Sequence, residues 1–222
     1  MSTILLLKFF HLIAFVYWLG GDLGTYYASR FVARADLDVG ARATALDIMM
    51  GCDQAPRVCM PLIFALGFHL AVRMSFVDAS SAIVALVWLI CLGWIAMVLA
   101  IHFGHGKSWL TGLQVFDTYF RYVMIAVIGG SAIYALVSGN IYNGNWLAVK
   151  SLVFAALMAC GLMIRRSLVD FVPAWIELQS KGPSEKVNTI IRNSIRGCVP
   201  YVHVIWLGLL INAALGLHLI NF

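Results

Sequence analysis

The hydrophobic positions of this chain fall into six long apolar stretches, and most charged residues lie between them. A helix that crosses the hydrocarbon core of a bilayer needs about 20 mostly apolar residues. Six stretches meet this requirement, at residues 3–26, 57–76, 80–103, 117–137, 145–164 and 198–220. The pattern therefore predicts an all-α protein, a polytopic transmembrane helical bundle of about six spans, with residues 1–222 forming a single domain.

The composition agrees with a protein whose outer surface is covered by lipid. Hydrophobic residues make up 62% of the 222 positions and charged residues 11%, whereas an average soluble domain is roughly 45–50% apolar and about 25% charged. A soluble fold of this size leaves much of its surface in water and cannot hide so many apolar side chains. The formal net charge of +5 does not indicate nucleic-acid binding, because the basic residues are spread over the loops.

Two connections between the predicted spans are long, at residues 28–56 and 165–197. The second one ends in an amphipathic segment, residues 183–196. Four apolar residues recur there at helical spacing: Val187, Ile190, Ile191 and Ile195. This spacing is typical of a helix that lies on the membrane surface, so we predict a cytoplasmic surface helix here.

Lysine and arginine are distributed unevenly over the two sides of the predicted bundle. With six spans, the long loops share one side, and twelve basic residues lie on it, against three on the other. Cytoplasmic loops of membrane proteins carry an excess of Lys and Arg. We therefore predict that the long loops are cytoplasmic and that both termini lie on the outer, periplasmic side of a bacterial inner membrane.

Ionisable residues inside the predicted spans are the candidate functional residues, because a charged group at the bilayer centre costs about 2.5–3.5 kcal/mol on insertion scales. A rise of about 1.5 Å per residue assigns each of them a depth. Five fall in one layer of the outer half: Lys8, His11, His69, Arg73 and Lys150. Trp18, seven residues after His11, shares its helix face.

Two histidines at equal depth on different helices suit a b-type haem, whose iron takes an imidazole nitrogen on each axial side. We hypothesise that His11 and His69 ligate the haem iron and that the nearby cations Lys8, Arg73 and Lys150 contact the haem propionates. The absence of a Cys-x-x-Cys-His motif excludes covalent c-type haem. The alternative is that the histidines form hydrogen bonds between helices and that the cations snorkel to the outer interface.

A weaker second site lies at the inner ends of the spans. His102 and His105 end the third span, and His203 begins the sixth. These histidines could bind a second haem or a quinone headgroup. The alternative is that they are solvated at the headgroup boundary.

Copper is the competing cofactor. Five soft ligands lie near one membrane entry: Met49, Met50, Cys52, Cys59 and Met60. Thiolate and thioether ligands select Cu(I), although Met and Cys also fill gaps in apolar helices.

Two short motifs resemble a superfamily of bacterial membrane proteins. Lys8-Phe-Phe-His11, followed by Trp18-Leu-Gly-Gly21, resembles the first helix of the HemJ-type protoporphyrinogen oxidases and of the membrane domain of copper-resistance protein D. Trp146-Leu-Ala-Val-Lys150 is similar to a second element of that superfamily. The resemblance implies a helical bundle that binds haem b, with His11 as an axial ligand and Lys150 as the lysine of the second element.

These features predict an integral membrane haem-b protein with a redox role, which exchanges electrons with a quinone, a porphyrinogen or a periplasmic redox partner. A membrane oxidoreductase is compatible with this prediction, although no catalytic residue is identified. Two other classes stay open: a copper uptake or resistance permease, and a structural or assembly subunit of a larger membrane complex, or a homo-oligomer. No P-loop, Gly-x-Gly-x-x-Gly, His-Glu-x-x-His or Gly-x-Ser-x-Gly motif is present, which argues against nucleotide-driven and common hydrolytic mechanisms.

Overall fold

The computed structural model describes residues 2–104, 107–139 and 142–219. Its helices are α1 (Thr3–Val32), α2 (Val39–Cys52), α3 (Gln54–Arg73), α4 (Ser81–Phe103), α5 (Leu110–Ser138), α6 (Asn145–Ser167), α7 (Phe171–Lys181) and α8 (Glu185–Gly216). Six helical stretches of the described residues are long and apolar enough to cross a membrane: α1, α2 with α3, α4, α5, α6 with α7, and α8. The predicted all-α polytopic bundle is therefore confirmed, while the predicted end of the last span, Ile220, lies outside the described residues.

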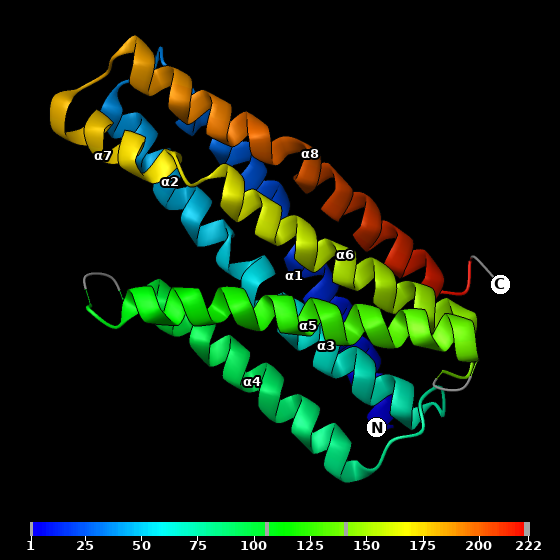
Figure 1. The fold of residues 1–222 in the computed structure, drawn as a ribbon. Coiled ribbons are helices and arrows are strands. Elements are labelled where there is room, and N and C mark those ends of the chain that lie inside the picture. The colour runs from blue at the N-terminus through cyan, green and yellow to red at the C-terminus, as the bar shows by residue number, and fades with distance from the viewer. Residues whose placement is uncertain (1, 105–106, 140–141, 220–222) are drawn as a thin grey trace.

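The chain runs up and down through the bundle, so that both termini lie at one end (Figure 1). We call this the terminal end. The opposite end, which we call the distal end, carries α2, α7 and the first half of α8. Six passes place the two termini together because an even number of crossings returns the chain to its starting side.

Local sequence signals explain where several helices begin and end. Asp38 caps α2 by accepting a hydrogen bond from the Ala41 backbone N–H at 2.9 Å, and Ser184 caps α8 by accepting from Val187. Such side chains satisfy backbone donors that have no partner inside the helix. α5 ends at Gly139, which adopts a left-handed φ of 69°, a conformation that glycine adopts at no steric cost.

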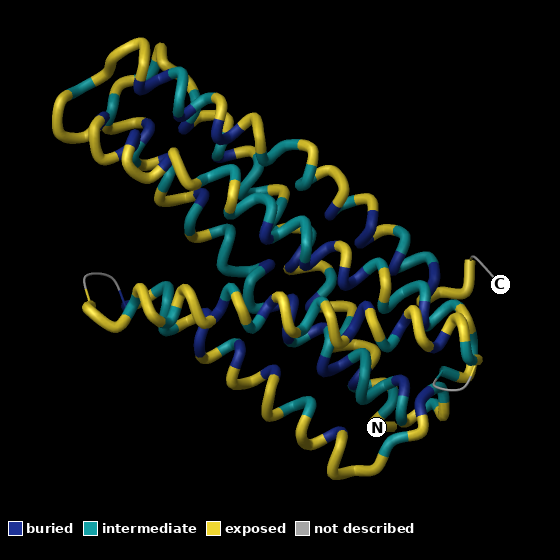
Figure 2. Tube along the Cα trace, in the orientation of Figure 1, coloured by how far each residue is buried: buried dark blue, intermediate teal, exposed yellow. Residues whose placement is uncertain are grey.

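The main hydrophobic core lies where α1, α3, α6 and α8 meet, with α4 packed chiefly on α3 and α5 on α6. Figure 2 shows the buried positions along the facing sides of these helices. Small residues permit the close approach. A Cβ on Gly208 of α8 would lie 2.5 Å from a Leu157 methyl group of α6, and small residues at such contacts are typical of helix packing in membranes.

A second hydrophobic core lies at the distal end, between α1, α2, α7 and the first half of α8. Val187 and Ile191 of the predicted surface helix are almost fully buried there. The segment 183–196 belongs almost entirely to α8, which continues through Pro200 into the membrane part. The helices around it, α7 among them, cover three of the four residues of its apolar stripe, while Ile190 is partly buried.

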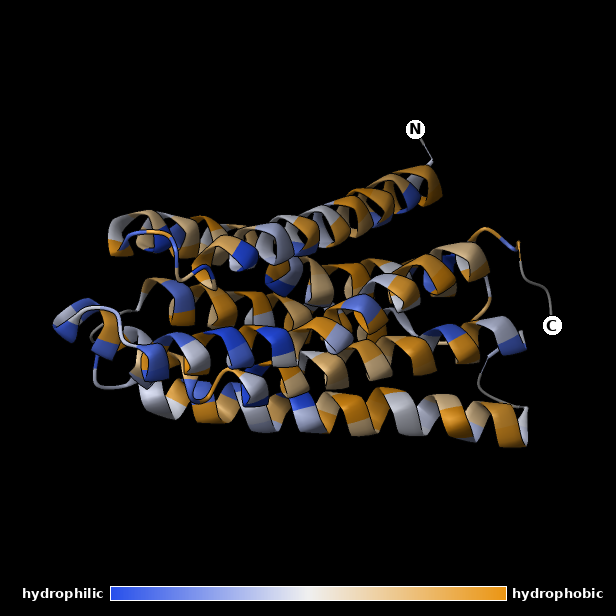
Figure 3. Ribbon diagram, turned by 90° about the horizontal axis from the view of Figure 1, so that it is seen from above, coloured by the Kyte–Doolittle hydropathy of each residue, from blue (hydrophilic) through white to orange (hydrophobic). Residues whose placement is uncertain are grey.

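Large apolar side chains cover the outside of the membrane-spanning part. Leu89 is 70% exposed and Val137 is 84% exposed, and many others on the same helices are similar. Figure 3 shows hydrophobic residues along the outer helix surfaces and hydrophilic ones gathered towards the end opposite the termini. Exposed apolar surface on this scale is compatible with lipid and not with water, so the bilayer is a partner of this protein.

Candidate functional site

His11 of α1 lies against α3. A Cβ on Gly67 would lie 2.9 Å from His11 Cε1, so the imidazole fills the space left by the missing side chain. His11 Nδ1 is buried and makes no hydrogen bond of good geometry, although the Ile63 backbone acts on the imidazole as a hydrogen-bond partner. A buried polar atom without a well-formed hydrogen bond is rare in native structures.

Lys150 of α6 reaches the same region from the other side. Its Nζ lies 2.6 Å from the position of a Cβ on Gly216 of α8. The positive charge of Lys150 acts on His11. No described carboxylate forms an ion pair with Lys150. A cation in an apolar environment without a counterion is costly, and the position therefore favours an anionic group.

His69 lies on a different side of α3. Its Nδ1 accepts a hydrogen bond from Trp88 Nε1 of α4 at 3.3 Å, and the two rings meet edge to face. Gly67, which His11 covers, and His69 are two residues apart, which is about 200° around a helix. The structure therefore does not bring His11 and His69 to one iron. They share a depth, but α3 turns them to opposite sides.

The other predicted residues of the outer layer separate as well. Lys8 and Arg73 are exposed on the outside of the bundle. Trp18 is 4% exposed and packs edge to face on Phe154, as part of the main core. The exposure of Lys8 and Arg73 agrees with the alternative in which these cations snorkel to the membrane interface.

Of the predicted second site, the structure describes His102 and His203. His102 contacts Phe103 on its own helix. His203 of α8 contacts Tyr26 of α1 and Trp206. His105 lies outside the described residues. The ring contacts of His102 and His203 thus lie in different parts of the bundle.

The soft ligands of the copper hypothesis are divided between two hydrophobic cores. Met49 belongs to the distal core, whereas Cys59 and Met60 belong to the main core. The Cys52 sulfur packs on α1, where a Cβ on Gly24 would lie 2.8 Å from it. Within the described part of the chain, no three His, Cys, Asp or Glu residues form a group that could hold a metal ion.

The structure contains a buried ion network that the sequence analysis missed. Asp117 of α5 is fully buried and pairs with Arg121 at 3.0 Å and with Arg165 of α6 at 2.6 Å. Arg121 is 6% exposed. The predicted span began at residue 117, which assigned both residues to a membrane boundary, but α5 begins at Leu110. The sequence feature that could have revealed this pair is the presence of two opposite charges, Asp117 and Arg121, four residues apart on an apolar helix.

Two further groups complete this network. Arg57 of α3 pairs with Asp53 and its charge also acts on Asp117 and Arg121. The Arg121 guanidinium lies over the Trp94 ring of α4, with Cζ 5.2 Å from the ring centroid, at the distance of a cation–π contact. The network therefore joins α3, α4, α5 and α6.

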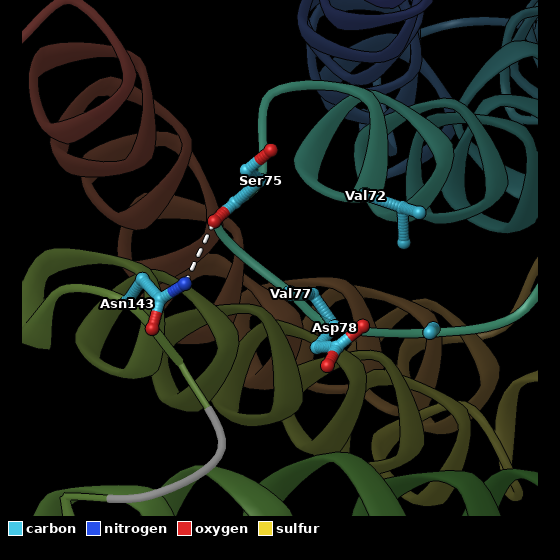
Figure 4. A pocket seen from close by; sticks show the side chains of 6 residues that line it. Val72, Ser75, Val77, Asp78 and Asn143 are labelled. Atoms are coloured by element: carbon cyan, nitrogen blue, oxygen red, sulfur yellow. Dashed lines mark hydrogen bonds between the residues drawn. The ribbon is translucent and has the colours of Figure 1, made fainter.

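A pocket of about 280 Å³ at the terminal end links two loops (Figure 4). The Asn143 side-chain amide donates to the Ser75 carbonyl at 2.8 Å across it, and Ser75 has a left-handed φ of 60°. Asp78 is the one ionisable residue that lines this pocket. The arrangement ties the α3–α4 loop to the residues before α6, and we assign it a structural role.

The fold and the burial pattern define the class of this protein, which is a multi-pass helical membrane protein. Comparison of the chain with protein-family models, curated proteins and solved structures gives no match. The resemblance to the HemJ and copper-resistance protein D superfamily thus stays a prediction from the two motifs.

Proposed function

We propose that this chain binds haem b at His11 and takes part in electron transfer across or at a bacterial inner membrane. The observation that carries the proposal is the His11 imidazole held inside the bundle against Gly67, where the charge of Lys150, a cation with no described counterion, acts on it. Imidazole is a common axial ligand of haem iron. The motif resemblance singles out the same two residues, out of the five predicted for the outer layer.

The proposal assigns the haem iron to His11 and not to the pair of His11 and His69, because α3 turns these two rings to different sides. His11 would supply the axial nitrogen, with its ring positioned by the contact with Gly67 of α3. Lys150 would neutralise a propionate with a charge-assisted hydrogen bond. When bound, the haem supplies one-electron chemistry, and the apolar surroundings and the axial imidazole tune its potential.

The excess of Lys and Arg at the distal end supports an orientation with that end in the cytoplasm and both termini in the periplasm. His11 and Lys150 then lie in the outer half of the membrane. The electron partner in this proposal is a membrane quinone, a porphyrinogen or a periplasmic redox protein. No observation favours the copper permease, since its soft ligands are divided between two cores.

The test is a reduced-minus-oxidised absorption spectrum of the detergent-purified protein. We expect a Soret band and sharp α and β bands for the wild type, which are lost in His11→Ala. The matched control is His69→Ala, which removes the other predicted ligand and should keep the bands, because His69 is turned towards Trp88. Circular dichroism of each variant verifies that the helices are intact.

Three outcomes would overturn the proposal: a wild-type protein without haem after haem supplementation, bands that persist in His11→Ala, or bands lost only in His69→Ala. The last outcome would move the ligand to the opposite side of α3.

A further inference from the structure

The three arginines around Asp117 outnumber the two carboxylates with which they form ion pairs, Asp53 and Asp117, and a further carboxyl group, Asp22 of α1, adjoins the network through Asp53. Asp117 is shared by two guanidinium groups, those of Arg121 and Arg165. Arg57 is already paired with Asp53. The charges that act on Arg121 are those of Asp117, Arg165 and Arg57, which is one carboxylate against two other cations. A buried surplus charge of this kind is costly unless an opposite charge offsets it.

Two hydrogen-bond donors in this network have no partner among the described residues. They are Nη2 of Arg121 and Nε1 of Trp94. Both side chains are more than nine-tenths buried, with Arg121 6% and Trp94 1% exposed. They belong to one contact, because the Arg121 guanidinium lies over the Trp94 ring. A buried donor without an acceptor is rare in native proteins and requires an explanation.

The network leads from the rim of the bundle to its interior. Arg165 lies two residues before the end of α6, and its side chain is 31% exposed. Asp117 is fully buried, and Arg121 follows one turn further along α5. Arg121 lies eleven residues after the start of α5, which is about 16 Å into the helix. A ligand that reaches it must therefore carry its polar group into the apolar part of the bundle.

We propose that Arg121 and Trp94 form a binding site for the oxyanion head of an amphiphile, a carboxylate or a phosphate, which enters from the membrane leaflet at the distal end. The free Nη2 and Nε1 groups would donate to one anion, and its charge would offset the surplus cation. The acyl tail would lie along the exposed apolar surface of α4 and α5. This site is separate from the His11 region on α1 and α3, so the two proposals succeed or fail independently.

The test measures the thermal unfolding midpoint of the purified chain in uncharged detergent during titration with two probes. Oleate presents a carboxylate, and dioleoyl phosphatidate presents a phosphate. Oleyl alcohol and dioleoylglycerol have the same chains without the anion and serve as controls. A ligand that binds only the folded state raises the midpoint as its concentration increases. We expect this rise with one or both oxyanions and not with the neutral controls.

The decisive variant is Trp94→Phe, which keeps a ring under Arg121 and removes only the N–H donor. We expect it to weaken oxyanion binding about tenfold, since a hydrogen bond to a charged group contributes roughly that factor. Trp88→Phe removes an indole N–H from the same helix and is the matched control, with unchanged affinity expected. Arg121→Gln should abolish the oxyanion response.

A merely structural role for Trp94 predicts a different result. Removal of a donor that never had a partner would leave the unfolding midpoint of the ligand-free protein equal or higher and leave oxyanion affinity unchanged. Equal affinity in wild type and Trp94→Phe, no response to either oxyanion, or an equal response to oleyl alcohol would each overturn the proposal. A response to only one probe would identify the source as carboxylate or phosphate.

Discussion

His11 of α1 occupies the space that a side chain on Gly67 of α3 would fill, with 2.9 Å between His11 Cε1 and the Cβ position of that glycine. The contact fixes where the imidazole lies relative to α3, because the ring cannot move closer to the helix. A larger residue at position 67 would displace the ring. The same contact separates His11 from His69.

We expect Gly67→Ala to displace the His11 ring and to destabilise the protein by about 1–3 kcal/mol, the usual cost of overpacking a well-packed contact. If His11 ligates haem, the variant should also lower haem occupancy. The free energy of unfolding in mixed micelles measures the first effect and the Soret absorbance per chain the second. In a His11→Ala background the methyl group has room, so Gly67→Ala should cost much less there. Equal costs in both backgrounds would contradict the contact.

Lys150→Met should stabilise the protein without cofactor and weaken cofactor binding. The lysine has no described counterion, and an apolar side chain of similar length removes the cost of keeping a cation there, by about 1 kcal/mol or more. Haem retention during dilution, which depends on neutralised propionates in our proposal, should fall. Lys8→Met is the control, because Lys8 is exposed and should change neither measurement.

Asp117→Asn should be strongly destabilising, by about 3–5 kcal/mol, because it leaves the buried Arg121 and the neighbouring Arg165 without their shared carboxylate. Denaturation in mixed micelles measures the loss. Asp117→Leu combined with Arg121→Met should recover a large part of it, since apolar residues of similar volume replace buried ion pairs well. A single variant that retains wild-type stability would show that the network contributes little.

Asp36 is the matched control for Asp117. It lies in the loop between α1 and α2 and pairs with Arg34, with both side chains largely exposed. The hydrogen bond from Arg34 and its charge lower the pKa of Asp36. A lowered carboxyl pKa means that any contribution to stability is present above the unfolded-state pKa and is lost as the pH falls through the folded-state value. Because water screens exposed pairs, Asp36→Asn should leave stability unchanged.

Arg42→Ala should loosen the distal core without affecting the membrane part. Arg42 is fully buried, donates to the Val32 carbonyl at 3.0 Å and to the Asn188 side chain at 2.8 Å, and lies over the Trp175 ring. Its loss leaves buried acceptors unpaired, at about 1–3 kcal/mol each. Limited proteolysis should become faster at residues 182–184, between α7 and α8. Unchanged cleavage would contradict this role, and Arg34→Ala provides an exposed arginine for comparison.

The sequence alone determined the span count and the helical class of the bundle. Apolar stretches of bilayer length are a local property of the chain, and the rise per residue of a helix does not depend on its neighbours. His11 and His69 could be assigned one depth for this reason. Lys150 was placed in the same layer by the same argument.

Tertiary structure alone decided which residues at one depth meet. The rotation of a helix about its axis depends on the helices packed against it, and α3 directs Gly67 towards His11 and His69 towards Trp88. The segment 183–196 shows the same limit, because its periodicity revealed an apolar stripe but not whether lipid or other helices of the chain cover it. The Asp117 network escaped prediction because the span boundary was placed at residue 117, and because the pairing of Asp117 with Arg165 across α5 and α6 arises only when those helices pack together.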